Sequence, residues 1–364
     1  MTTPGQAEQA AQSDAASPAH TANTASPASP AHNASPASPA HPAHNAHTTT
    51  PGQAADSYAY LGPLGTYSHQ ATLTFTADAP GATLVECVSI SEIFDLVDRG
   101  RVAYGVVPIE NALEGSVNET LDAFAFTSGA QILGETVVDI HHDLIVRPGV
   151  ELADVRTVVS HPQALGQCRR WLAEHLRTSA TLPSNSTSEG VRQAVADTQG
   201  QTAAIGTALA AELFGGQIRA SQIEDHYGNQ TRFVLIATSS STFSTSSTSA
   251  SSSALRNSGG FRPSTSSGAG RAEEPQSDAY KTSLALFMKE DRPGTLLMIL
   301  EEFAYAGVNL SKIQSRPTKR ALGDYMFWID IDAHADDLHV KTALDCLRLK
   351  LREVKLLGSY PRVV

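Results

Sequence analysis

Two long stretches of this 364-residue chain lack the apolar spacing that a folded core requires. Residues 1–56 consist mainly of Ala, Ser, Pro, His and Thr, with imperfect copies of ASPASPAH, and residues 239–280 are rich in Ser, Thr and Gly. Such segments cannot bury enough apolar surface to offset the entropy that ordering costs. We therefore predict a disordered tail and a flexible linker, with folding confined to residues 57–238 and 281–358.

The charge balance and the apolar runs argue against two classes of partner. The formal net charge is −11, whereas nucleic-acid binding relies on basic surface, so we expect no nucleic-acid partner. No apolar run approaches the ~20 residues that cross a bilayer, and the N-terminus has no signal-peptide pattern. We expect a cytoplasmic protein with no membrane contact, in which the N-glycosylation pattern at residues 229–231 is a chance match.

The sequence predicts neither a metal nor a cofactor. Cys87, Cys168 and Cys346 stand far apart without a C-x-x-C pair, which favours free thiols over a disulfide or a zinc site. The first lysine is Lys281, so no Schiff base and no pyridoxal phosphate linkage can form earlier in the chain. A carboxylate bound there must be recognised by arginine, hydroxyls or backbone N–H groups.

Residues 57–238 alternate apolar runs with amphipathic stretches, which is typical of an α/β fold with parallel sheets covered by helices. The expected strands are 58–62, 83–88, 102–109, 157–161, 203–206 and 233–237, and the expected helices are 68–77, 89–100, 162–176 and 187–197. Ligands of such folds collect beyond the carboxyl ends of the strands.

Residues 281–358 predict a different architecture. Strands are expected at 281–289, 308–317, 323–333 and 354–360, and helices at 293–307 and 338–351. This order is the ferredoxin-like βαββαβ arrangement, a small fold that more often binds or regulates than catalyses.

Five polar loops flank the strands of the α/β segment. Their hydroxyl and amide side chains, with one arginine, suit a small polyanion. The candidates are Thr66 and Ser68; Glu110, Asn111, Gly115 and Ser116; Ser160 and Gln167; Ser186 and Thr187; and Asn229, Thr231 and Arg232. Taken singly, most of these loops are more typical of capped turns, with caps at Ser68, at Ser116 or Asn118, and at Ser186 and Thr187.

The same loops resemble the signatures of prephenate dehydratase. GPLGTYSHQA, VPIENALEGSV, SHPQALGQC, STSEG and GNQTRFVLI occur in the order of that family, and RPGTL and QSRP resemble the ligand loops of its C-terminal ACT domain. The resemblance implies conversion of prephenate to phenylpyruvate, water and carbon dioxide in phenylalanine biosynthesis, without a cofactor. It also implies a two-lobed domain like a periplasmic binding protein, with lobes at 58–133 plus 215–238 and at 134–214.

The resemblance further implies roles for individual residues. Catalytic positions fall on Thr231, Arg232, Asn111, Glu110 and Gln167, and substrate-binding positions on Thr66, Ser68, Gly115, Ser116, Ser160, Ser186, Thr187, Asn229 and Phe233. The positions that would bind phenylalanine are Gly294, Thr295, Leu296, Gln314, Ser315, Arg316 and Pro317. Two of these depart from the family pattern, which usually has Ala or Ser at 295 and Glu at 314. That glutamate would meet the ammonium group of the effector.

The chemistry suggests how two of these residues divide the work. Breaking the ring C–OH bond requires a proton for the leaving hydroxide, whereas a tight clamp on the ring carboxylate would slow its loss as carbon dioxide. We therefore expect Arg232 to grip the side-chain carboxylate of prephenate. Thr231 would then donate to the departing hydroxyl, helped by Asn111 and Gln167.

Other interpretations remain open at this stage. The enzyme could act on arogenate, which carries an amine in place of the keto group, or the chain could be an amino-acid sensor without turnover. No helical pattern precedes residue 57 that would suit a chorismate mutase, so a bifunctional enzyme is not expected. ACT domains tend to pair, so we expect a homodimer or homotetramer.

Overall fold

The computed structural model describes residues 56–238, 280–290, 292–321 and 323–363. The predicted disordered tail and all but the last residue of the predicted linker lie outside these ranges. The described residues belong to one compact unit, residues 49–364. Within them, no helix is long and apolar enough to cross a membrane, and the three cysteines are free thiols as predicted.

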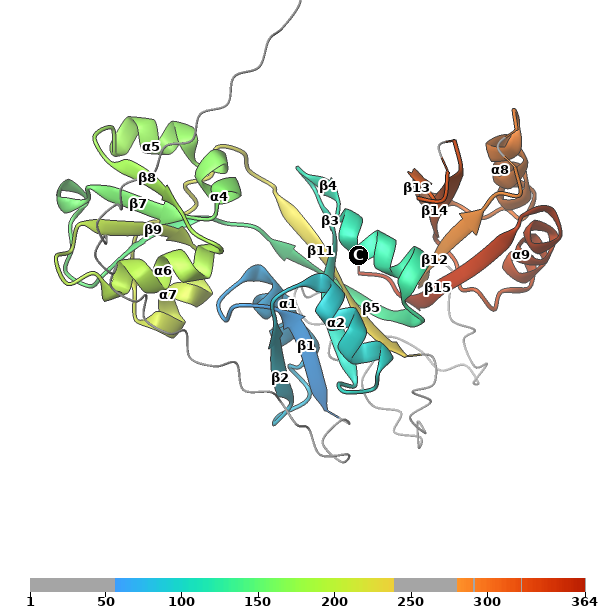
Figure 1. The fold of residues 1–364 in the computed structure, drawn as a ribbon, viewed down its shortest axis with the longest axis horizontal. Coiled ribbons are helices and arrows are strands. Elements are labelled where there is room, and N and C mark those ends of the chain that lie inside the picture. The colour runs from blue at the N-terminus through green and yellow to red at the C-terminus, as the bar shows by residue number, and fades with distance from the viewer. Residues whose placement is uncertain (1–55, 239–279, 291, 322, 364) are drawn as a thin grey trace, which may run out of the picture. The chain divides into compact units, whose positions relative to one another are not determined.

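The first sheet has the strand order β2-β1-β3-β11-β5, with β4 paired to β3 (Figure 1). Its strands are β1 Ser57–Leu61, β2 Thr83–Cys87, β3 Tyr104–Asn111, β4 Gly115–Ser116, β5 Ala130–Asp139 and β11 Gln230–Thr238. Its helices are α1 Tyr67–Phe75, α2 Ile90–Asp98 and α3 Asn118–Asp122, the last continuing as a π-helical turn, Ala123–Thr127. We call residues 57–139 and 230–238 the first lobe.

The second sheet has the order β10-β6-β9-β7-β8. Its strands are β6 Asp143–Val146, β7 Thr157–Ser160, β8 Ala180–Pro183, β9 Thr202–Gly206 and β10 Gln217–Ala220. Its helices are α4 Pro162–Gln167, α5 Arg169–His175, α6 Thr187–Ala196 and α7 Ala208–Phe214, with a 3-10 turn at Leu152–Asp154. We call residues 143–220 the second lobe.

Both sheets confirm the predicted α/β class, but they place the lobe boundaries elsewhere. β5 belongs to the first sheet because it pairs with β11 along its whole length, and β10 belongs to the second because it pairs with β6. The predicted boundaries at 134 and 215 are therefore wrong, and the chain crosses between lobes at residues 140–142 and 221–229. The sheets are also mixed rather than parallel, since β11 runs antiparallel to β3 and β5.

The two crossing segments are hydrogen-bonded to each other. The amide of Ile140 donates to the carbonyl of Asn229 (2.8 Å), and the amide of Ile223 donates to the carbonyl of His142 (2.8 Å). The amide of His142 also donates to the carboxylate of Glu224 (3.0 Å). The link between the lobes therefore consists of two chain segments hydrogen-bonded to each other rather than two independent loops.

The predicted helix 162–176 is broken at Cys168 by the returning chain. The carboxylate of Asp225 accepts the amides of Arg170 and Trp171 at the start of α5, and the amide of Asp225 donates to the carbonyl of Gln167 at the end of α4. One residue from the crossing thus ends the first helix and caps the second.

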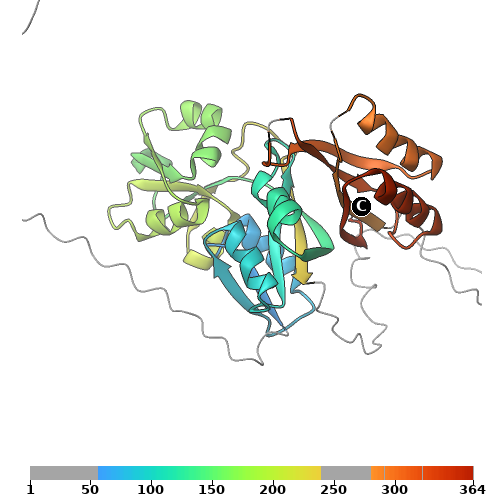
Figure 2. The same cartoon turned by 45° about the vertical axis from the view of Figure 1, so that its right-hand side comes forward.

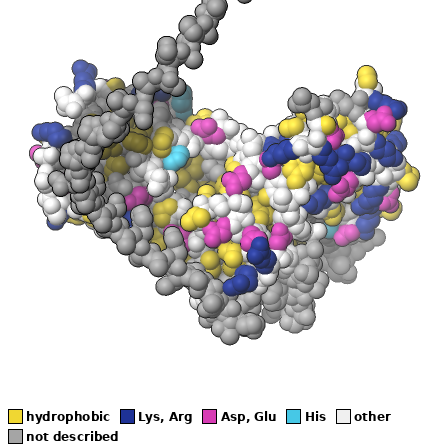
Figure 3. Space-filling view, viewed as in Figure 1, with side chains coloured by type: hydrophobic (Ala, Val, Ile, Leu, Met, Phe, Trp, Pro, Cys, Tyr) yellow, Lys and Arg dark blue, Asp and Glu magenta, His cyan; other side chains and the backbone are white. Residues whose placement is uncertain are grey.

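The C-terminal domain, residues 280–361, has the predicted βαββαβ order. Its elements are β12 Tyr280–Phe287, α8 Thr295–Tyr305, β13 Leu310–Pro317, β14 Tyr325–Ile331, α9 Leu338–Lys350 and β15 Glu353–Pro361. The strand order is β13-β14-β12-β15, antiparallel throughout. Figure 2 shows α8 and α9 on one face of this sheet. On the face seen in Figure 3, Lys and Arg side chains gather over this domain, as expected from a chain whose lysines all follow residue 280.

Strand alternation gives the C-terminal sheet two buried faces. Leu284 and Leu286 of β12 pack with Ile299 of α8 and Leu344 of α9. Trp328 of β14 points the other way and joins one continuous apolar cluster with first-lobe side chains. Within that cluster the rings of Trp328 and Phe124 contact each other, with their centroids 5.9 Å apart. The C-terminal domain therefore shares a hydrophobic core with the first lobe.

The backbone of β15 approaches β5 too closely for a side chain. A Cβ atom added at Gly358 would lie 2.3 Å from the carbonyl oxygen of Ile132 and 2.9 Å from its Cβ. Since the obstacle is mostly backbone, it cannot move aside as a flexible side chain could.

We predict that Gly358→Ala loosens this packing and lowers the free energy of unfolding by about 1–3 kcal/mol, the usual cost of overpacking. Gly129→Ala is the matched control, because a Cβ there would meet no atom within 4 Å. Urea unfolding of both variants checks the difference. Equal midpoints for the two variants would contradict the contact.

Candidate active site

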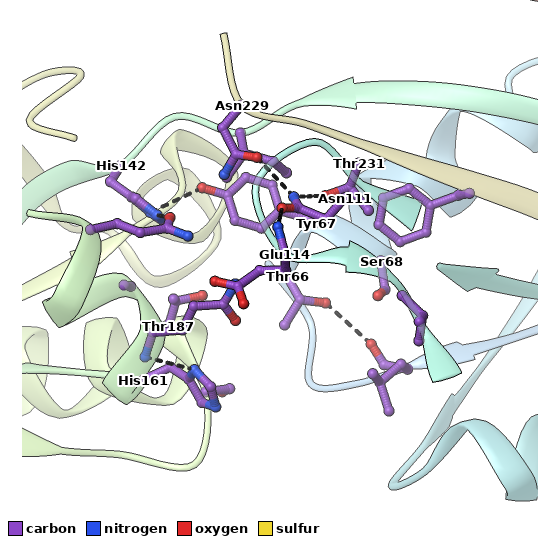
Figure 4. A pocket seen from close by; sticks show the side chains of 18 of the residues that line it. Thr66, Tyr67, Ser68, Asn111, Glu114, His142, His161, Thr187, Asn229 and Thr231 are labelled. Carbon is purple, nitrogen blue, oxygen red and sulfur yellow. Dashed lines mark hydrogen bonds between the residues drawn. The ribbon is translucent and has the colours of Figure 1, made fainter. Parts of the chain in front are cut away.

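The largest concentration of predicted site residues surrounds one cavity of about 480 Å³ lined by both lobes. It lies beyond the carboxyl ends of β1 and β3 and against the N-terminal ends of α1, α4 and α6. Figure 4 shows Asn111, Asn229 and Thr231 gathered on one side of it, with Thr187 and His161 on the other. The predicted residues that line it are Thr66, Ser68, Asn111, Gly115, Ser116, Gln167, Ser186, Thr187, Asn229, Thr231 and Phe233.

Thr231 and Asn111 are hydrogen-bonded to each other on the side of the cavity formed by the first lobe. The Nδ2 of Asn111 donates to Thr231 Oγ1 (2.8 Å) and to Asn229 Oδ1 (2.8 Å). The orientation of the amide is fixed because its Oδ1 accepts the backbone amides of Leu113 and Glu114 (both 2.9 Å). Thr231 Oγ1 therefore accepts a hydrogen bond from Asn111, and its own proton remains available to a ligand in the cavity.

Strand pairing explains why these two side chains meet. β11 and β3 are antiparallel, with Thr231 opposite Asn111 and Arg232 opposite Glu110. Directly opposed residues share a face of a sheet, and the next pair along projects from the other face. Thr231 and Asn111 line the cavity, so Arg232 and Glu110 point away from it.

The structure contradicts the predicted carboxylate clamp. Arg232 does not line the cavity; its guanidinium instead pairs with Glu110 (3.0 Å), Glu135 (3.1 Å) and Asp330 (3.2 Å). Glu110 likewise lies outside the cavity, and its neighbours Lys312 and Arg232 lower the pKa of its carboxyl below the ordinary value, against the opposing effect of burial. Although Thr231 and Arg232 are neighbours in the sequence, only Thr231 faces the cavity.

Ser160 also lies outside the cavity, contrary to the prediction. Its side chain is fully buried, and its Oγ donates to the carbonyl of Ile205 (2.7 Å). As the last residue of β7 it faces the neighbouring strand β9, so it links strands within the second lobe.

Of the three helix N-termini at the cavity, those of α1 and α6 have hydroxyl caps. Thr66 caps α1 by accepting the amide of His69, so the cap is Thr66 and not Ser68. Ser186 caps α6 by accepting the amide of Glu189 (3.0 Å); of the two caps that the sequence suggested, Thr187 is instead the first residue of the helix. Gly190 lets α6 approach β7, since a Cβ there would lie 2.9 Å from the carbonyl oxygen of Val159.

The cavity lining contains no lysine or arginine among the described residues. An anion bound here would meet the partial positive charge and free N–H groups of the two helix ends. Hydroxyl and amide side chains supply the other donors. The arrangement can thus bind a small anion without a full positive charge beside it.

Other polar residues that line the cavity were not among the predicted site residues; among them are Tyr67, His142 and Glu114, the last from the polar loop after β3. The Nε2 of His142 lies 2.8 Å from Gln167 Oε1, and its Nδ1 lies 3.3 Å from the hydroxyl of Tyr67. Burial lowers the pKa of His142 below the ordinary histidine value, so the imidazole is neutral at neutral pH. The signal was the His-His pair directly after the apolar alternation of residues 130–140, a strand that the sequence reasoning missed.

The predicted effector residues fall into two separate groups in this single chain. Gly294, Thr295 and Leu296 begin α8 and line a second cavity of about 380 Å³. Residues 314–317 lie on β13, where Gln314 accepts the hydroxyl of Ser116 (2.7 Å) and Arg316 binds Asn118 and Asp122. No described cavity contains both groups.

Comparison with known families agrees with this architecture. A family model for prephenate dehydratase matches residues 58–241, and one for the ACT domain matches residues 282–345. The prephenate dehydratase of Methanocaldococcus jannaschii is 36% identical over 83% of this chain and 97% of its own length.

Two solved structures have similar folds over most of the chain. A prephenate dehydratase from Arthrobacter aurescens in complex with L-Phe is 35% identical, with a TM-score of 0.67, and the match covers 84% of this chain and 90% of that one. The quorum-quenching acylase GqqA is 26% identical, with a TM-score of 0.66, over 84% of this chain and 98% of that one.

We predict that His142 makes the fold sensitive to mild acid. Because its folded pKa lies below the ordinary value of about 6.5, the unfolded chain takes up a proton first as the pH falls. The stability that His142 contributes is therefore present above about pH 6.5 and declines below it. Urea midpoints at about pH 7.5 and 5.5 should differ more in the parent than in His142→Gln, and an equal difference would contradict the assignment.

Proposed function

Since the chain belongs to the prephenate dehydratase family, we propose that it converts prephenate to phenylpyruvate, water and carbon dioxide in the cavity around Thr231. One observation carries the placement of the chemistry: Thr231 Oγ1 accepts a hydrogen bond from Asn111 (2.8 Å), which leaves the threonine proton available to a ligand. The family motifs around it converge on the same cavity.

The reaction needs a proton and a path for the electrons of the carboxylate. The C–OH bond breaks as hydroxide departs, the bond to the ring carboxylate breaks as carbon dioxide leaves, and its electron pair completes the aromatic ring. Thr231 donates to the leaving oxygen, which departs as water, and the net reaction consumes one proton from solvent. Because an alcohol is a weak acid, the donation must come late in C–O cleavage and in a site shielded from water.

The two carboxylates of prephenate are bound by helix ends and not by Arg232. We place them at the N-termini of α1 and α6, near Thr66 and Ser186, because both ends face the cavity. Helix-end dipoles hold an anion less tightly than an arginine fork does. A ring carboxylate held in this way can lose its charge as carbon dioxide forms without breaking a strong ion pair.

Phenylalanine is the proposed effector of the C-terminal domain. The Arthrobacter aurescens relative was solved with L-Phe, and Gly294–Leu296 and Gln314–Pro317 are the candidate binding positions. In a single chain these groups are apart, so a site made of both would need a second copy. We propose a dimer or tetramer formed through this domain, for which the edge strand β13 and the exposed Leu297 of α8 offer surface. A cytoplasmic location is part of the same proposal.

Arogenate is the alternative substrate, and an amino-acid sensor the alternative role. Glu110 faces away from the cavity, so Glu114 is the acidic residue of this loop that lines it. An acylase activity like that of GqqA is not favoured by the contacts, because the cavity histidines bond to Tyr67, Gln167 and the amide of Gln163 and not to a serine or threonine hydroxyl. Following phenylpyruvate enolate absorbance with prephenate and with arogenate separates these alternatives, since a sensor consumes neither.

We predict that Thr231→Val lowers kcat for prephenate by about 10²–10⁴-fold, the usual contribution of a positioned proton donor, with little change in KM. Thr231→Ser keeps the hydroxyl and should retain most of the turnover, which makes it the matched control. Steady-state kinetics on the purified full chain provide the measurement. A valine variant with undiminished kcat would rule out the donor role.

A further inference from the structure

A cluster of six charged side chains lies at the junction of the first lobe and the C-terminal domain. We call it the junction cluster; it comprises Arg232, Glu110 and Glu135 from the first lobe and Lys281, Lys312 and Asp330 from the C-terminal domain. Three cations meet three carboxylates, so the cluster is neutral as a whole. Apart from Glu110, each side chain is at most 12% exposed.

Arg232 is the centre of the junction cluster. Its Nη2 contacts both Glu110 (3.0 Å) and Asp330 (3.2 Å), and its Nη1 contacts Glu135 (3.1 Å). One guanidinium thus joins strands β3, β5 and β14, the last of which belongs to the C-terminal domain. The carboxylates more than offset burial, and the pKa of Arg232 is raised above its ordinary value.

Asp330 is held rigidly on the C-terminal side. Its other oxygen accepts the hydroxyl of Ser283 (2.7 Å) and the indole N–H of Trp328 (2.7 Å). Trp328 lies in the apolar cluster shared by the two domains. The carboxylate that reaches Arg232 is therefore fixed to the core of the C-terminal sheet and cannot adapt independently of it.

A second chain of contacts leads from β13 to the loop after β3. The Nζ of Lys312 contacts Glu110 (3.0 Å) and donates to Ser116 Oγ (2.9 Å). Ser116 in turn donates to Gln314 (2.7 Å). Ser116 also lines the active-site cavity, so one hydroxyl touches both the cavity and the C-terminal domain.

A gain in folding stability does not by itself explain why these charges are buried in the junction cluster. Removing charges from water costs several kcal/mol per ion, and apolar residues of similar size often stabilise a fold as well or better. A buried network does fix one geometry, because each ion must meet its partners. Here the network fixes the pairing of Arg232 with Glu110, which is adjacent to the pairing of Thr231 with Asn111.

We propose that Arg232 and Glu110 are positioning residues through which β13 and β14 of the C-terminal domain set the placement of Thr231 and Asn111. This inference rests on the proposed function of Thr231. A displacement of Asp330 or Lys312 shifts Arg232 or Glu110, which lie on the face of the strand pair β3–β11 that contacts the C-terminal domain. The opposite face of the same strand pair carries the hydroxyl of Thr231. The C-terminal domain is then a structural part of the active site as well as a regulatory module.

The test uses the full chain with Asp330→Asn and Lys312→Met, each alone and combined with Thr231→Val. We expect each single variant to lower kcat by about tenfold with KM within about threefold, because alignment of the donor is lost but the helix ends that bind substrate are untouched. In the Thr231→Val background the same substitutions should change kcat less than twofold, since no donor remains to be aligned. A merely structural role would reduce kcat equally in both backgrounds and would overturn the proposal.

Lys341→Met is the matched control, because Lys341 pairs with Asp336 at the start of α9 and touches no member of the junction cluster. It should leave kcat and KM unchanged. Thermal unfolding shows whether each variant folds. If Asp330→Asn does not fold, the kinetics of Lys312→Met, whose partner Glu110 is partly exposed, decide the question.

Hydrogen–deuterium exchange gives a readout that does not depend on turnover. Peptides covering residues 109–118 and 229–234 should exchange faster in Asp330→Asn than in the parent, with no change in Lys341→Met. Unchanged exchange in these peptides would overturn the proposal. If the parent does not turn over prephenate, the proposed function fails, while the exchange result still decides whether the domains are coupled.

Discussion

The antiparallel pairing of β11 with β3 is the constraint on which the rest of the structure depends. Its register places Thr231 opposite Asn111 on one face and Arg232 opposite Glu110 on the other. The first pair faces the cavity and the second faces the C-terminal domain, so a single strand pair carries both the reacting hydroxyl and the interdomain charges. A slip of one residue would exchange the two faces and remove both functions together.

The separation of these faces also separates two kinds of electrostatics. Full charges are concentrated in the junction cluster, where they compensate one another, whereas the described lining of the cavity offers helix ends, amides and hydroxyls, with Glu114 as its one acidic side chain. A cation beside a carboxylate that must leave as carbon dioxide would stabilise the starting state more than the transition state. Because Arg232 lies on the face of β11 opposite the cavity, it does not stabilise that starting state. Its guanidinium instead binds carboxylates from β3, β5 and β14.

The sequence predicted the elements well where local chemistry determines them. The cap at Ser186 and the apolar runs that form β12 and β14 are local features, and they were found. The sequence failed where a position depends on long-range pairing. β5 was not recognised because its apolar residues alternate only partly, so its pairing with β11 and the direction of Arg232 were both missed. His142 was missed for the same reason, since it follows that unrecognised strand.

The tied crossing between the lobes has a mechanical consequence. A single connecting strand acts as a swivel that permits both bending and torsion. Here the amides of Ile140, His142 and Ile223 bond one crossing to the other, so torsion would have to break those bonds while bending perpendicular to them would not. These hydrogen bonds therefore oppose torsion between the two lobes more than they oppose bending, so the connection is stiffer in one direction than in the other.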